Sequence, residues 1–137
     1  MALDSVVELA RRNDTTDRAV IATDAGGTVL YWGSGAEALY AWKAPEVLGR
    51  SILDVTPTDL SRTEAERIMR MLQEGRSWSG DFVVTTKTGR RFVAHVTDIP
   101  VQDPAGRLAG IIGISRRSAY TLDLAADHRP SPEFAQR

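Results

Sequence analysis

The sequence predicts an α+β fold, in which helices cover at least one face of an antiparallel sheet. The main observation is a run of three β-type segments, residues 78–86, 91–101 and 108–115, separated by short turns that contain Gly89 and Gly106. Turns this short join strands that run antiparallel, so the three segments form a meander. The helical patterns lie outside this stretch, and a sheet needs such elements to bury its apolar face.

An amphipathic helix is predicted at the N-terminus, over residues 1–13. Apolar residues recur there at the spacing of one helix face, and charged residues occupy the rest of the wheel. The apolar residues are Leu3, Val6, Val7 and Ala10. This stripe can cover the sheet of its own domain or pair with a second copy of the chain, and the spacing leaves both open. The same four residues are therefore the candidate dimerisation residues.

Two further strands are predicted after this helix, at residues 19–23 and 28–32. The connecting residues 24–27 read Asp-Ala-Gly-Gly, which is a hairpin signal. The predicted sheet therefore has five strands. Residues 36–42 and 45–48 then form two short helices, the second with proline in its first turn and glycine after its end.

One longer internal helix follows a single predicted helical turn at residues 51–55. Its start carries a capping box, in which the Ser61 hydroxyl and the Glu64 carboxylate each serve a backbone N–H. Gly75 ends it. Its apolar stripe can lie across the sheet, and consists of Ala65, Ile68, Met69 and Leu72.

The periodic pattern fades after Ser115, and residues 116–124 can form a helix that leaves the domain. The sequence thus predicts three parts. These are the N-terminal helix at 1–13, one domain at 19–116, and a partly mobile C-terminal extension or linker at 117–137. A chain of 137 residues fits a single domain with its own core.

Composition excludes several kinds of partner and chemistry. The chain has 17 basic and 18 acidic residues, so it has no overall basic field to attract nucleic acid or an acidic membrane surface. It has no cysteine, and therefore no disulfide, thiolate nucleophile or thiolate metal ligand. No apolar run is long enough to span a bilayer, and the N-terminus lacks a signal pattern. We therefore expect a cytoplasmic protein without membrane insertion.

The order and spacing of several short segments resemble a PAS domain over about residues 19–115. The segments are AVIATDAGGTVLYW, GAEALYAW, PEVLGRSILDVTP, LQEGRSW, KTGRRF and DPAGRLAGIIGIS. The resemblance implies a PAS-like (profilin-like) antiparallel sheet in the strand order 2-1-5-4-3, with helices on its concave face. It also implies a sensory or interaction module that binds a small molecule, a cofactor or a partner and signals to an attached output domain.

Particular residues narrow the cofactors that this resemblance allows. Blue-light members of the family attach flavin to a cysteine after the segment that residues 46–50 resemble, and this chain has Ser51 there, so covalent flavin chemistry is excluded. Heme-binding members usually place a histidine on the long helix, and residues 61–73 contain none. We predict no cofactor, with noncovalently held flavin as an alternative. That alternative depends on whether the tryptophans pack in the core or stack on a ring; they are Trp32, Trp42 and Trp78.

No catalytic or metal-binding set is visible in the sequence. His95 lies within a predicted strand and is read as a surface or hydrogen-bonded residue, and His128 lies in the C-terminal extension. Helix capping and turn formation account for acidic residues such as Asp54 and Asp59. We therefore expect that the chain is not an enzyme.

The resulting hypothesis is a regulatory sensory module of a bacterial-type signalling protein, such as a sensor kinase of a two-component system or a second-messenger enzyme. Its small-molecule pocket would lie between the helices and the concave face of the sheet. The sequence departs from the PAS family pattern at the exit from the last strand, where residues 117–119 read Arg-Ser-Ala and many members of the family have Asp-Ile-Thr. The candidate pocket residues are Leu39, Leu48, Ile52, Met69, Leu72, Phe82, Val84 and Ile112.

Two alternatives stay open at this point. The candidate pocket residues can simply fill the core, because protein interiors close with few voids. The chain would then be a ligandless dimerisation module, and deletion of residues 1–13 would give a monomer.

Overall fold

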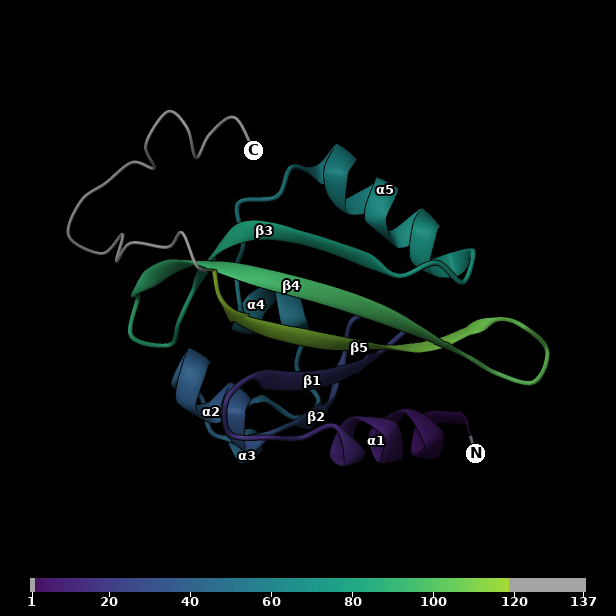
Figure 1. The fold of residues 1–137 in the computed structure, drawn as a ribbon, viewed down its shortest axis with the longest axis horizontal. Helices are drawn as coiled ribbons and strands as arrows, with labels where there is room; N and C mark the ends of the chain where they lie inside the picture. The colour runs from purple at the N-terminus through teal and green to yellow at the C-terminus, as the bar shows by residue number, and fades with distance from the viewer. Residues whose placement is uncertain (1, 119–137) are drawn as a thin grey trace.

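Five antiparallel strands form one sheet in the computed structural model, which describes residues 2–118 (Figure 1). The strand order is β2-β1-β5-β4-β3, so the predicted fold class and the order implied by the PAS resemblance are both confirmed. The strands are β1 (Ala19–Asp24), β2 (Val29–Trp32), β3 (Trp78–Thr85), β4 (Arg91–Gln102) and β5 (Leu108–Arg117).

The central pair of the sheet joins the two ends of the domain. β5 pairs with β1 from Ala19↔Ser115 to Asp24↔Gly110, although these strands are far apart in the sequence. The meander supplies the rest, because β4 pairs with both β3 and β5. Gly89 lies in the first meander turn with a φ of 87°, a left-handed conformation that glycine adopts without strain.

Four helices connect β2 to β3: α2 (Ser34–Tyr40), α3 (Ala44–Val47), α4 (Ile52–Val55) and α5 (Arg62–Gln73). The capping box predicted at the start of α5 is present, with both the Ser61 and the Glu64 hydrogen bonds formed. Figure 1 shows α5 lying along the β3 side of the sheet. A deep core lies beneath the helices on the concave face and includes Ile21, Tyr40, Val84 and Phe92.

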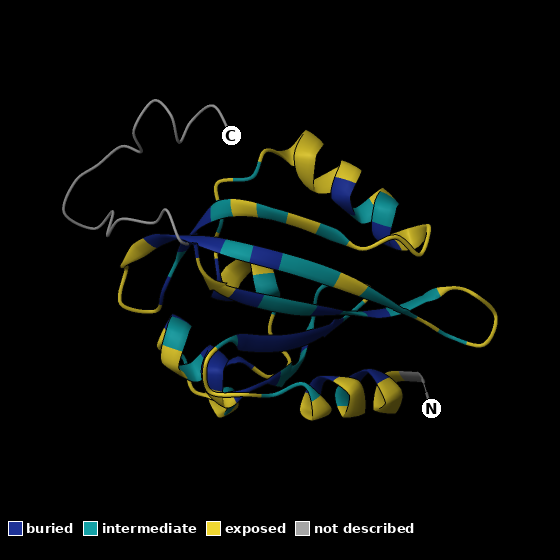
Figure 2. Ribbon diagram, viewed as in Figure 1, coloured by how far each residue is buried: buried dark blue, intermediate teal, exposed yellow. Residues whose placement is uncertain are grey.

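The N-terminal helix α1 (Ala2–Arg12) covers the outer face of the same sheet. Val6 and Ala10 are fully buried there, in a cluster with Val20, Ala22 and Ile112. A side chain at Gly110 would meet Val6 at 2.9 Å, so the glycine allows this close approach. Figure 2 shows that the exposed residues of α1 lie on its side away from the sheet.

This packing limits which residues of the predicted dimerisation stripe are available to a second copy. Two of its members, Val6 and Ala10, are in the domain's own core and cannot join a second copy while α1 stays docked. Leu3 is 46% exposed and Val7 is half-buried, so only these two reach the surface. Of the two uses that the spacing left open, the docked arrangement is the one the structure shows for Val6 and Ala10.

The last strand is two residues longer than predicted, because β5 continues through Arg117. The remainder of the predicted extension, 119–137, lies outside the described residues, and so does His128. No helix in the described part of the chain is long and apolar enough to cross a membrane.

Candidate functional site

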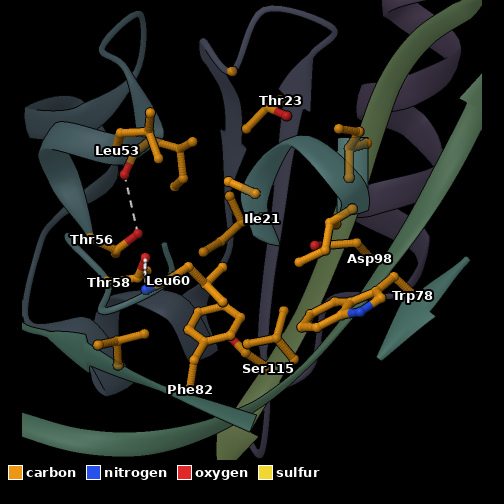
Figure 3. Close-up of a pocket in the computed structure, with 18 of the residues that line it drawn as sticks. Ile21, Thr23, Leu53, Thr56, Thr58, Leu60, Trp78, Phe82, Asp98 and Ser115 are labelled. Atoms are coloured by element: carbon orange, nitrogen blue, oxygen red, sulfur yellow. Dashed lines mark hydrogen bonds between the residues drawn. The ribbon is translucent and has the colours of Figure 1, made fainter. Parts of the chain in front are cut away.

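A cavity of about 230 Å³ lies between the concave face of the sheet and the helices α4 and α5 (Figure 3). Its floor is formed by inward-facing residues of β1, β4 and β5, among them Ile21, Val96 and Ile111. α5 lines one side through the apolar stripe predicted from the sequence, and β3 lines another. The cavity is therefore bounded by elements from both ends of the domain.

Five of the eight predicted pocket residues line this cavity: Ile52, Met69, Leu72, Phe82 and Val84. They come from α4, α5 and β3, and the PAS resemblance implied that the helices lie on the concave face. Their contact with any ligand stays a prediction.

The other three predicted residues, Leu39, Leu48 and Ile112, lie elsewhere. Ile112 faces outward against α1, and its neighbour Ile111 takes the cavity position. Strand alternation made one of the two face inward, but both are apolar and the pattern did not distinguish them. Leu48 follows α3 and is 48% exposed, and Leu39 packs against the core outside the cavity.

An aromatic pair forms the β3 wall. The rings of Trp78 and Phe82 stack with centroids 5.9 Å apart and an interplanar angle of 25°. A Cβ atom at Gly80 would lie 2.5 Å from the Trp78 ring, so the glycine between them lets the indole lie flat on this edge strand. Trp32 and Trp42 instead donate hydrogen bonds to backbone carbonyls, of Trp42 and Val55 respectively, which makes them structural.

The hydroxyl groups in the wall largely serve the protein itself. The Tyr40 and Ser115 hydroxyls form a buried hydrogen bond of 2.7 Å. Burial raises the pKa of Tyr40 to about 12, so its hydroxyl stays neutral. Thr56 donates to the Ile52 carbonyl, and the Thr58 hydroxyl accepts from the Leu60 backbone N–H. These hydroxyl groups therefore stabilise the cavity wall, since their hydrogen bonds go to other protein groups.

Asp98 is the one charged residue among the cavity residues that the sequence prediction missed. It lies on β4 directly opposite Trp78 of β3 and Gly113 of β5. A Cβ atom at Gly113 would be 3.1 Å from one Asp98 carboxylate oxygen, so the glycine makes room for this side chain. The Asp98 side chain is half-buried, because one side of its carboxylate borders the cavity. Protein atoms surround the carboxylate on its other sides. Burial raises its pKa from 3.8 to about 6.

The signal for Asp98 was present in the strand pattern. Alternation along β4 places Phe92, Ala94, Val96 and Asp98 on one face. A charged residue on an otherwise apolar strand face indicates a candidate binding site when that face is known to point inward.

The only histidine in the described residues belongs to a separate cluster on the outer face. His95 Nδ1 lies 2.7 Å from one oxygen of Asp81, and Ser118 donates to the other oxygen at 3.2 Å. The aspartate is in the middle of this cluster, whereas a nucleophilic triad has the histidine in the middle. Residues 2–118 also contain no group of three side chains suited to a metal ion.

Comparison with known protein families gives a match to the PAS fold over residues 8–117. The chain belongs to the PAS family. PAS domains are sensory and regulatory modules, and this one has the sheet order and helix arrangement described above. A comparison with curated proteins finds no match.

Solved structures of PAS domains are similar to this one in fold. A PAS domain from Colwellia psychrerythraea is 19% identical with a TM-score of 0.67, over 81% of this chain and 94% of that one. A PAS domain of an HTR-like protein from Haloarcula marismortui is 16% identical with a TM-score of 0.65, over 84% and 93%. An RNA-binding light-oxygen-voltage receptor is 22% identical with a TM-score of 0.69, over 80% of this chain. The present chain spans only 32% of that receptor's length.

In this PAS domain Ser51 has a structural role. Its hydroxyl caps α4 by accepting a hydrogen bond from the Leu53 backbone N–H at 3.3 Å. A serine oxygen used in this way stabilises the start of a helix.

Proposed function

We propose that this PAS domain senses a small, mainly apolar molecule bound in the cavity and relays its presence to an attached output domain. The cavity is the observation that supports the proposal. Protein cores usually close with few voids larger than a water molecule, and an apolar cavity of about 150 Å³ holds a benzene molecule. A space of about 230 Å³ is therefore large enough for a ring compound with a short side chain.

A relay through β5 is supported by the contacts at its end. Ser115 borders the cavity and pairs with Tyr40, and the strand ends two residues later at Arg117. The next residue, Ser118, donates its N–H to the Val93 carbonyl and its hydroxyl to Asp81. A ligand that moves Ser115 would thus change how the outgoing chain is held against β3 and β4.

The proposed role is regulatory and not catalytic, in a cytoplasmic signalling protein such as a sensor kinase of a two-component system or a second-messenger enzyme. The apolar lining suits binding more than bond cleavage, since acyl or phosphoryl transfer needs several convergent polar groups. The output domain would follow β5.

Native mass spectrometry of freshly purified protein, followed by a thermal-shift assay, tests the proposal. We expect a bound compound, or a rise in melting temperature with an added one. Ile111→Phe places a larger side chain in the cavity and should abolish binding. Ile114→Phe is the matched control, because it changes the same strand on the opposite face. Equal binding by both variants would place the ligand outside the cavity. A yellow preparation would instead indicate noncovalent flavin.

Homodimerisation through α1 is a second candidate, favoured by two exposed leucines. Leu3 is 46% and Leu9 is 39% exposed on this helix. Analytical ultracentrifugation of a Leu3→Asp/Leu9→Asp variant tests it, because Val6 and Ala10 would still hold α1 on the sheet. A dimer that persists in this variant would exclude the α1 surface.

A further inference from the structure

Asp98 carries the only formal charge in the cavity lining. The lining has two titratable residues, Asp98 and Tyr40, and the tyrosine hydroxyl is neutral and already bonded to Ser115. The neighbouring parts of α4 and α5 contribute aliphatic, thioether and threonine side chains. An ionised carboxylate therefore faces an apolar space.

No partner for this carboxylate is present among residues 2–118. No hydrogen bond or ion pair joins the Asp98 side chain to them, and the cavity lining contains no lysine, arginine or histidine. Burying a charge without a partner is unfavourable, so buried carboxylates are normally paired or hydrogen-bonded. A cationic group that arrives with a ligand would supply this partner.

Resting on the function proposed above, we propose that the ligand is a small organic cation, a protonated amine carried on an apolar ring-containing body. The carboxylate of Asp98 would accept a charge-assisted hydrogen bond from the amine. Trp78 lies directly across the strand pair from Asp98, so the amine would also lie beside an indole ring, which attracts cations. An anionic ligand would be repelled by the same carboxylate.

The size and lining of the cavity define the rest of the ligand. About 230 Å³ exceeds the roughly 150 Å³ that holds benzene, so one or two fused rings with a short amine-bearing chain match the space. Phe82, Ile68 and Met69 would contact the rings.

Binding of such an amine should weaken at acidic pH. Asp98 must be ionised to accept the ammonium group, so affinity should fall as the pH drops through about 6. The other hydroxyl-bearing residues of the lining are Tyr40, Ser115, Thr23, Thr56 and Thr58, and none of them titrates in this range. No other charged side chain lines the cavity. A neutral ligand would show no such loss.

Two sets of probes that differ only in the terminal group test this inference by isothermal titration calorimetry. One set is tryptamine, tryptophol and indole-3-acetate, and the other is 2-phenylethylamine, 2-phenylethanol and phenylacetate. We expect at least one amine to bind at pH 7.5 and to bind at least about tenfold more weakly at pH 5. Asp98→Asn should weaken amine binding by at least about 30-fold and leave alcohol binding unchanged. Asp54→Asn, an exposed carboxyl in α4, is the control.

The results separate this inference from the proposed function. If an alcohol or an acid binds as tightly as its amine, and Ile111→Phe abolishes that binding, the cavity is a ligand site but the ligand is not a cation. Full amine affinity in Asp98→Asn, or no amine binding by the wild type, also overturns the inference. If no probe binds and mass spectrometry of the purified protein finds no compound, both proposals fail.

Discussion

Replacing Asp98 by asparagine should stabilise the unliganded domain at neutral pH. Burial raises the pKa of this carboxyl from 3.8 to about 6. Because the pKa is higher in the folded chain than in the unfolded chain, ionisation disfavours folding. One pKa unit corresponds to about 1.4 kcal/mol, so the charge lowers the free energy of unfolding by about 3 kcal/mol at pH 7. The variant should recover about that amount.

The stability difference between Asp98→Asn and the wild type should decrease as the pH falls. Above pH 6 the carboxyl is ionised in both states, and its destabilising effect is complete. As the pH falls from about 6 towards 3.8, the folded chain takes up the proton first and the effect disappears. The difference between variant and wild type should therefore shrink from about 3 kcal/mol at pH 7 to about 0.5 kcal/mol at pH 4.

Taking this difference isolates Asp98 from the other acidic residues. A hydrogen bond from Lys87 lowers the pKa of Glu46, and one from Thr15 lowers that of Asp17. These two groups act in the opposite direction, because their stabilising effect is lost as the pH falls through their folded pKa values. They are the same in both proteins and cancel.

Urea denaturation at pH 7 and pH 4, followed by circular dichroism, measures the effect. The proteins are the wild type, Asp98→Asn and the exposed control Asp54→Asn, which should match the wild type at both pH values. The reasoning is refuted if Asp98→Asn is no more stable than the wild type at pH 7, or if its advantage is the same at pH 4. Either result would mean that the carboxylate is well hydrated or paired.

Three further predictions test the packing around the cavity and α1. Val6→Ala should lower the free energy of unfolding by about 2 kcal/mol, because it removes buried methyl groups, whereas Leu3→Ala should change it by less than about 0.5 kcal/mol. Tyr40→Phe should cost about 1–2 kcal/mol, since it leaves a buried hydroxyl without its partner. Gly80→Ala should cost about 1–3 kcal/mol and shift the tryptophan fluorescence, because the new methyl group displaces the Trp78 ring.

Chemical denaturation and emission spectra decide these three cases. Equal effects of Val6→Ala and Leu3→Ala would mean that α1 is not docked on the sheet in solution. A Tyr40→Phe variant as stable as the wild type would argue against the buried hydroxyl pair. Unchanged emission from Gly80→Ala would show that the indole does not lie over residue 80.

Local elements were determined by the sequence alone. The turn glycines Gly89 and Gly106 fixed the meander, and the capping box at Ser61 and Glu64 marked the start of α5 within one residue. Such signals depend on neighbouring residues only, so they can be recognised without the fold. The strand order came from the resemblance to a family, because the β1–β5 pairing joins residues far apart in the chain.

Only the tertiary structure decided which face of each strand is inside. Here α1 covers the outer face and α2 to α5 cover the concave face, so both faces are partly apolar and strand alternation does not distinguish Ile111 from Ile112. For the same reason the sequence did not predict that Asp98 lines the cavity, or that no cationic side chain lines it too. Periodicity specifies that residues two apart share a face, but the burial of that face depends on what packs against it.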